Sequence, residues 1–267
     1  MSPATAGTLG QSRDRSRLEE LLVTEVFSAI QGEGALVGHR QVFVRLTGCN
    51  IRCSYCDQPE ALVKAAGPCR LEATPGRRDW EPRHSPLGVE EVAAAVDRLW
   101  SGLPHHSVAL TGGEPLMQAA RLGGLLEALA AREVPVMVET NGTLPGALAR
   151  VLGRVSLVSV DLKLPSVDGQ TVDPAVQRRF LALAARARVW AKIVLGPATD
   201  EDELGAAVAM VAEVAPAAEV FLQPVTPFGG VTGAPTPDQV LAWQDLALRL
   251  HPRVRVVPQT HKSIGQL

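Results

Sequence analysis

The chain has 267 residues, of which 46% are hydrophobic and 20% charged, with a net charge of −2 and a pI of about 6.3. This composition predicts a globular protein that can bury a large core, in one large domain or two small ones. The charge argues against a nucleic-acid binder, which usually carries a basic patch, and no apolar run approaches the roughly 18 residues of a membrane span.

The first 20 residues are polar and lack the apolar middle region of a signal peptide. We therefore expect residues 1–20 to be a flexible leader. Residues 21–267 are expected to form a single domain, because no shift in composition marks a second one. Four cysteines in the whole chain, three of them clustered as reduced thiols, predict a cytoplasmic location.

Seven apolar runs of strand length follow one another along the chain, at 42–47, 107–111, 134–140, 155–161, 189–195, 219–224 and 253–258. They are continuous, as in strands that are covered on both faces. Amphipathic helical patterns separate them, and the last begins with Thr236 as N-cap and Pro237 as first helical residue. Alternating strands and helices predict a parallel sheet, in a partial or distorted (β/α) barrel of six to seven parallel strands.

One stretch of the chain, 60–86, has no periodic pattern and is rich in Pro, Gly and Arg. We expect it to be an inserted loop beside the cysteines. Loops of this length in compact domains are often functional or mobile.

Three of the four cysteines lie in the segment TGCNIRCSYCDQ (47–58), spaced C-x3-C-x2-C. Disulfides use cysteines in pairs, and three so close together cannot all pair locally. A zinc site normally takes four ligands, and Cys69 is a possible fourth. Three thiolates that leave one coordination position free favour instead an iron–sulfur cluster with one open iron.

Polar and glycine-rich segments follow the predicted strands: GGEP (112–115), ETNG (139–142), DLK (161–163), LGP (195–197), QPVT (223–226) and QTHK (259–262). Any one of them could be an ordinary turn. The carboxyl ends of parallel strands, however, meet at the edge where such folds place their active sites. Together with the cysteine loop, these segments predict one site at that edge.

The cysteine spacing, the aromatic Tyr55 before the third cysteine and the GGEP segment together resemble the radical S-adenosylmethionine (SAM) superfamily. The resemblance implies that Cys49, Cys53 and Cys56 hold a [4Fe–4S] cluster whose open iron binds SAM. It also implies cleavage of SAM to a 5′-deoxyadenosyl radical, which takes hydrogen from the substrate. The second glycine of GGE would meet the cofactor through its backbone, where no side chain blocks the approach.

Two further segments, residues 23–57 with the sequence QGEG at 31–34 and the terminal PQTHKSIGQL (258–267), resemble the 7-carboxy-7-deazaguanine synthase family. The likeness covers nearly the whole chain apart from the leader and 60–86. It implies a carbon–nitrogen lyase that converts 6-carboxy-5,6,7,8-tetrahydropterin to 7-carboxy-7-deazaguanine with loss of ammonia, in queuosine and 7-deazapurine biosynthesis. It further implies Mg²⁺ as a second cofactor, a homodimer, and an electron donor such as flavodoxin or ferredoxin.

The resemblance assigns roles to residues at matching positions. Those expected around SAM are Tyr55, Asp57, Gly113, Glu114, Asp161, Lys163 and Gln223. Those expected around the pterin are Ile30, Gln31, Gly32, Arg45, Thr111 and Leu267. Arg45 would pair with the substrate carboxylate, which suits a bidentate guanidinium, with a structural ion pair as the alternative. Glu139 and His261 are candidates for proton transfer, and for His261 a solvated chain end is an equal alternative.

Two positions depart from the family pattern. Gln58 stands where many members carry the threonine that follows Asp57, which weakens the case for Gln58 as a magnesium ligand. Asp161-Leu162-Lys163 stands where many carry Ser-Pro-Lys.

Two other functions stay open. One is a radical activating enzyme that acts on a partner protein, against which QGEG and QTHK speak. The other is a non-enzymatic iron–sulfur or zinc module, against which GGEP and the polar strand ends speak.

Overall fold

The computed structural model describes residues 19–63, 65–227 and 231–266. Nearly all of the expected leader, and Leu267, lie outside these ranges. Glu20 already belongs to β1 (Glu20–Leu21), which pairs with β6 (Leu87–Gly88) in a small two-stranded sheet. Within the described ranges, no helix is long and apolar enough to cross a membrane.

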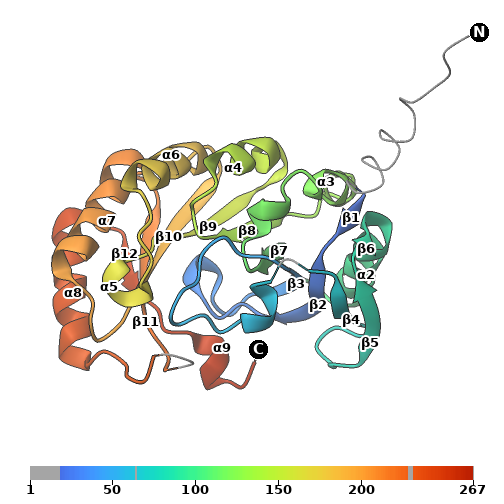
Figure 1. The fold of residues 1–267 in the computed structure, drawn as a ribbon, viewed down its shortest axis with the longest axis horizontal. Helices are drawn as coiled ribbons and strands as arrows, with labels where there is room; N and C mark the ends of the chain where they lie inside the picture. The colour runs from blue at the N-terminus through green and yellow to red at the C-terminus, as the bar shows by residue number, and fades with distance from the viewer. Residues whose placement is uncertain (1–18, 64, 228–230, 267) are drawn as a thin grey trace, which may run out of the picture.

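A ten-stranded sheet in the order β12-β11-β10-β9-β8-β7-β3-β2-β4-β5 forms the centre of the fold. Seven neighbouring strands run parallel, and each matches one of the seven predicted runs: β3 (Arg40–Leu46), β7 (Ser107–Gly112), β8 (Val136–Thr140), β9 (Leu157–Asp161), β10 (Arg188–Leu195), β11 (Glu219–Pro224) and β12 (Val254–Val256). The strand order has two free ends, so the sheet is open, and Figure 1 shows it curved as in a partial barrel.

Three further strands extend the sheet beyond β3. β2 (Val23–Ile30) pairs antiparallel with β3, and β4 (Gly67–Glu72) and β5 (Trp80–Ser85) form a hairpin at the edge. The expectation of an irregular inserted loop at 60–86 is therefore wrong. Prolines such as Pro82 hide this hairpin in the sequence, but an edge strand tolerates them because fewer of its N–H groups are needed in the ladder.

The longer helices lie along the outer, convex side of the sheet (Figure 1). They are α2 (Val89–Gly102), α3 (Leu122–Ala130), α4 (Pro145–Val151), α6 (Pro174–Ala184), α7 (Glu201–Val214) and α8 (Pro237–Leu250). Shorter helices are η1 (Gly34–Leu36), η2 (Pro59–Ala61), η3 (Pro115–Gln118), η4 (Leu152–Arg154), α5 (Pro165–Asp168) and α9 (Thr260–Ser263). Thr236 caps α8 in a capping box with Gln239, and Pro237 is its first residue, as predicted.

Side chains alternate between the two faces of each parallel strand. In β3, Val42 and Val44 pack in the main core under the helices, whereas Phe43 and Arg45 face the inner side. The inner face begins with an apolar cluster, here called the apolar floor: Phe27, Ala29, Leu36, Phe43, Ala109, Met137, Leu157, Trp190 and Phe221.

Two residues further along five of these strands, the inner face becomes polar. The side chains at these positions are Arg45, Thr111, Glu139, Lys192 and Gln223. The fold thus places a layer of hydrogen-bonding groups directly above the apolar floor, at the carboxyl ends of the parallel strands.

Candidate functional site

A cavity of about 220 Å³ lies at the carboxyl ends of the parallel strands, on the face away from the long helices. Its walls combine the loop after β2, the cysteine loop, the glycines after β7, the ends of β8 to β11 and the start of α9. Each of the predicted segments except LGP (195–197) contributes at least one residue to the lining of this cavity.

Most residues that the sequence analysis assigned to the site line this single cavity. They are Ile30, Gln31, Gly32, Arg45, Cys49, Cys53, Tyr55, Cys56, Asp57, Gln58, Thr111, Gly113, Glu139, Asp161, Lys163, Gln223 and His261. Glu114 does not line it, and Leu267 lies outside the described residues. Their assignment to a particular ligand stays a prediction.

The three clustered cysteines are free, half-buried thiols on the loop between β3 and η2. Burial raises the pKa of the Cys49 thiol and raises that of Cys53 to about 11, so a cation is needed to hold them as thiolates. Cys69 is buried in β4 away from the cavity, which removes it as a fourth zinc ligand. Within the described ranges, no three His, Cys, Asp or Glu side chains converge on a single ion. Three free thiols on one loop match the ligand set of a [4Fe–4S] cluster that leaves one iron open.

Glycines let the segment after β7 pack directly against the cysteine loop. A Cβ on Gly113 would lie 2.3 Å from the carbonyl oxygen of Gly48 and 2.7 Å from that of Ala61. The amide of Glu114 donates to the same Gly48 oxygen at 2.7 Å. Gly113 is therefore required by protein packing, in addition to the ligand approach that the sequence predicts.

Glu114 is fully buried behind the cavity wall. Its carboxylate accepts hydrogen bonds from the amides of Leu116 (3.0 Å) and Asn141 (2.8 Å) and from the Thr140 hydroxyl (3.0 Å). Burial raises the pKa of this carboxyl to about 7, although these donors partly oppose the shift. The side chain ties the segment after β7 to the ETNG loop, rather than facing the cavity as its assignment to SAM implies.

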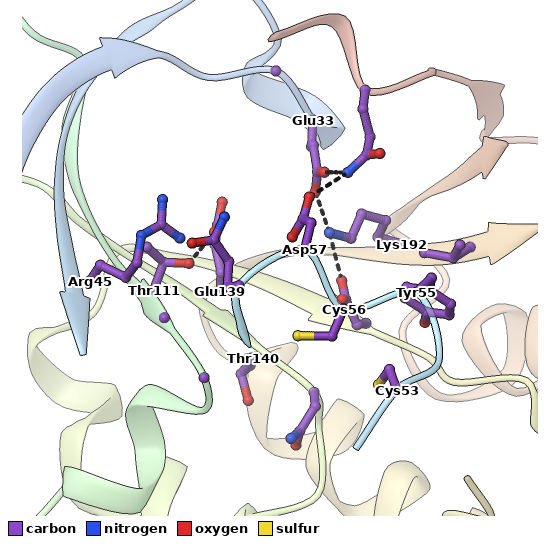
Figure 2. A pocket seen from close by; sticks show the side chains of 18 of the residues that line it. Glu33, Arg45, Cys53, Tyr55, Cys56, Asp57, Thr111, Glu139, Thr140 and Lys192 are labelled. Atoms are coloured by element: carbon purple, nitrogen blue, oxygen red, sulfur yellow. Dashed lines mark hydrogen bonds and ion pairs between the residues drawn. The ribbon is translucent and has the colours of Figure 1, made fainter. Parts of the chain in front are cut away.

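A row of ionic side chains, which the sequence analysis saw only in part, crosses the cavity. Lys192 pairs with Glu33 and lies 3.1 Å from Oδ1 of Asp161. Lys163 pairs with Oδ2 of the same Asp161 at 2.9 Å and reaches the Tyr55 hydroxyl at 3.2 Å. We call the four ionic side chains, Glu33, Lys192, Asp161 and Lys163, the charged row. Figure 2 shows Glu33 and Lys192 pointing toward one another.

Glu33 and Lys192 are not among the residues that were expected at the site. A lysine inside the apolar run VWAKIVL (189–195) is the same signal that identified Arg45 within β3, because a buried charge needs a partner. Burial alone would lower the pKa of Lys192, but Asp161 and Glu33 outweigh it and raise the pKa. Burial likewise opposes ionisation of Glu33, but Lys192 holds the Glu33 pKa below its usual value. Both groups are therefore charged.

Arg45 combines an internal ion pair with a place in the cavity wall. Its Nε lies 2.8 Å from Oε1 of Glu25, whose other oxygen pairs with Arg70 at 2.7 Å. The guanidinium lies 5.4 Å from the centre of the Phe27 ring in the apolar floor. The structural ion pair that the sequence left open is thus present, and it orients the guanidinium at the cavity edge.

Glu139 lies next to Arg45 on the same side of the cavity. Its Oε1 accepts from the Gln31 amide at 2.8 Å, and its Oε2 accepts from the Thr111 hydroxyl at 2.7 Å. Burial raises the pKa of Glu139, while Lys192 acts in the opposite direction. In Figure 2, Arg45, Thr111 and Glu139 gather on one side, opposite Cys53 and Tyr55.

The start of α9 forms part of the cavity wall. The amide and hydroxyl of Thr260 both donate to the carbonyl of Gly32, at 3.0 and 3.1 Å, and Lys262 pairs with Asp57 at 2.9 Å. His261 lines the cavity, and its partial burial lowers the pKa of its ring. The alternative of a solvated chain end is therefore wrong for His261.

The chain is similar to known proteins over most of its length. The chain matches the radical SAM superfamily model over residues 43–210. It is 43% identical over 246 residues to a 7-carboxy-7-deazaguanine synthase from Geobacter sulfurreducens, covering 91% of this chain and 96% of the relative. A relative of the same name from Methanothermobacter thermautotrophicus is 31% identical over 271 residues, covering 91% of this chain and 96% of the relative.

Among solved structures, QueE from Escherichia coli has the same fold with a TM-score of 0.57 at 20% identity, covering 90% of this chain and 93% of that one.

Proposed function

Because the chain belongs to the radical SAM superfamily and, within it, to the 7-carboxy-7-deazaguanine synthase family, we propose that it converts 6-carboxy-5,6,7,8-tetrahydropterin to 7-carboxy-7-deazaguanine with loss of ammonia. The observation that carries this proposal is that the cysteine motif and the QGEG and QTHK segments line one cavity. The relatives named 7-carboxy-7-deazaguanine synthase support this reading over a radical activating enzyme that acts on a polypeptide.

On the cluster side, Cys49, Cys53 and Cys56 would hold a [4Fe–4S] cluster, and Tyr55, Asp161 and Lys163 would hold SAM. Together these groups supply a 5′-deoxyadenosyl radical when bound. Lys163 is fixed by Asp161 and packs 5.2 Å from the Tyr55 ring centre, so this wall is preorganised. Gln223 adds a buried Oε1 that has no hydrogen-bond partner among the described residues, an acceptor suited to a ligand hydroxyl or amine.

On the opposite side, Arg45 would bind the substrate carboxylate, since its Nε is held by Glu25 and its outer edge borders the cavity. Glu139 would take up and hold a proton during the ring contraction, because burial already favours its protonated form. Gln31 and Thr111 fix the orientation of that carboxyl group. Ile30 and Gly32 border the same pocket, and His261 provides a second group for proton transfer.

The two residues that follow the third cysteine, Asp57 and Gln58, do not suit Mg²⁺. Asp57 is already paired with Lys262, and Gln58 offers only a neutral amide oxygen on a long side chain. The proposal also includes a homodimer in the cytoplasm and an electron donor such as flavodoxin or ferredoxin, which rest on the family resemblance.

The reaction is tested by anaerobic incubation of the reconstituted protein with the tetrahydropterin, SAM and dithionite. Mass spectrometry should detect 7-carboxy-7-deazaguanine, and an ammonia assay should detect an equal amount of ammonia. A Cys53→Ala variant should form neither product. Cleavage of SAM by the wild-type protein without any deazaguanine acid would show that the substrate is a different molecule.

A further inference from the structure

Lys192 holds two carboxylates that come from different parts of the chain. Its ammonium pairs with Glu33, in the loop after β2, and lies 3.1 Å from Asp161, at the end of β9. All three side chains line the cavity, and the lysine side chain is only 12% exposed. An ammonium this deeply buried is stable only when it is paired, and its three N–H donors allow Lys192 to contact both carboxylates at once. A change in the charge around one carboxylate therefore changes how strongly the ammonium is attracted to the other.

The two partners belong to segments that are assigned to different ligands, and this step rests on the proposed function. Asp161 also binds Lys163, which reaches Tyr55 in the cysteine loop, the half assigned to SAM. Glu33 follows directly on Gln31 and Gly32, the half assigned to the pterin. The same Glu33 oxygen accepts from Gln259 at 2.8 Å and from Gln223 at 3.2 Å, so Glu33 also touches the SAM side through Gln223.

Glu33 also connects Lys192 to the wall formed by α9. Gln259, its hydrogen-bond partner, is the N-cap residue of that helix. Strand β10 cannot easily release Lys192, because Ala191 and Ile193 are fully buried under the helices and Trp190 is packed in the apolar floor. The backbone of Lys192 is therefore held in place, and its ammonium contacts two carboxylates.

We propose that Lys192 couples the binding of the two ligands. SAM carries a sulfonium cation, which weakens the attraction between Asp161 and Lys192 when it enters the cluster side of the cavity. The ammonium then binds more strongly to Glu33, which fixes Glu33, Gln259 and the α9 wall around the pterin. SAM thereby raises the affinity for the pterin, and the pterin raises the affinity for SAM by the same factor.

The test is calorimetric titration of the cluster-reconstituted protein under anaerobic conditions and without reductant, so that both ligands bind without turnover. The affinity for the tetrahydropterin is measured with and without saturating SAM. We expect SAM to raise this affinity by about tenfold in the wild-type protein, a usual size for coupling between sites. In Lys192→Met the factor should fall below about twofold.

Lys163→Met is the matched control, because Lys163 is also a lysine bound to Asp161 but does not contact Glu33. It should bind SAM more weakly and keep the coupling factor. Glu33→Gln and Lys192→Gln remove the same connection and carry the test if Lys192→Met fails to fold or to hold iron. Far-UV circular dichroism and iron content identify such a failure.

Loss of coupling in the Lys192 or Glu33 variants alone would support the proposal. A wild-type protein without coupling, or Lys192 variants that retain it, would overturn the proposal while leaving the proposed reaction intact. If the wild-type protein binds no tetrahydropterin at all, the proposed function itself is wrong.

Discussion

The ammonium of Lys262 lies 2.9 Å from Oδ2 of Asp57, so α9 neutralises the carboxylate that directly follows the third cysteine of the cluster motif. Burial acts to raise the pKa of Asp57, but Lys262 outweighs it and holds the pKa below its usual value. A divalent ion at this place would have to compete with an ammonium that is already bound. Lys262 thus opposes the Mg²⁺ that the family resemblance implies at Gln58, although the two residues are more than 200 positions apart in the chain.

Turnover should therefore depend only slightly on Mg²⁺, changing less than about twofold between metal-depleted buffer and buffer with added Mg²⁺. Gln58→Thr should increase this dependence, because a hydroxyl on a stiff, branched side chain is a better placed ligand than a long amide. Lys262→Ala should do the same by freeing Asp57. A wild-type rate that falls more than about tenfold when Mg²⁺ is withheld would show that Gln58 is a competent ligand.

Iron binding should depend on three cysteines and not on the fourth. The reconstituted wild-type protein should hold about four irons per chain and absorb broadly in the visible range, as [4Fe–4S] proteins do. Changing Cys49, Cys53 or Cys56 to Ala should abolish iron loading, measured by a colorimetric iron assay. Cys69→Ala is the control, since Cys69 is buried in β4 away from the cavity. If Cys69→Ala also loses its iron, the cluster has a fourth ligand and no open iron.

Arg45→Ala should weaken pterin binding by about 2–4 kcal/mol, the range for removing a partner from a desolvated carboxylate. Binding of SAM should change little, because Arg45 lies on the opposite side of the cavity from Tyr55. Arg70→Ala is a matched control, because Arg70 pairs with the same Glu25 but does not line the cavity. Both affinities are measured by calorimetry. Arg45 does not bind the substrate if Arg45→Ala weakens the binding of both ligands equally. The same conclusion follows if Arg70→Ala weakens pterin binding as much as Arg45→Ala does.

Glu114 should make the protein less stable as the pH rises. Its pKa is 4.5 in the unfolded chain and about 7 in the folded protein, so between these values the folded state binds more protons. Glu114 therefore adds on the order of 3 kcal/mol to the free energy of unfolding below pH 4.5. This contribution is lost as the pH rises through about 7.

Equilibrium urea unfolding of the wild-type protein and Glu114→Gln at several pH values isolates this effect, because the variant has no carboxyl to titrate. The wild-type protein should lose stability relative to Glu114→Gln across this interval. Glu219→Gln, at an ion pair on the surface with Arg255, should show no such trend. A constant difference between the wild-type protein and Glu114→Gln would mean that Glu114 titrates at its ordinary pKa.

The sequence predicts the parallel strands and the cysteine site well because both signals are local. Each parallel strand is an apolar run, and the cysteine spacing is complete within ten residues. The β4–β5 hairpin has no such signal, since it lies at the edge of the sheet and only a minority of its residues are buried. Lys192 and Glu33 are 159 positions apart, so their pairing follows from the topology and cannot be seen from either segment alone. The direction of the Glu114 side chain likewise depends on Thr140 and Asn141, which belong to another strand end.

The two-residue alternation between the apolar floor and the polar layer above it has a consequence for how this protein tolerates change. Inserting or deleting one residue in β10 ahead of Lys192 would turn its ammonium toward the helices and turn apolar neighbours toward the ligands. The same holds for Glu139 in β8 and Thr111 in β7. Evolution and engineering can therefore exchange many side chains in these strands, but they cannot change the strand lengths between the floor and the site by a single residue.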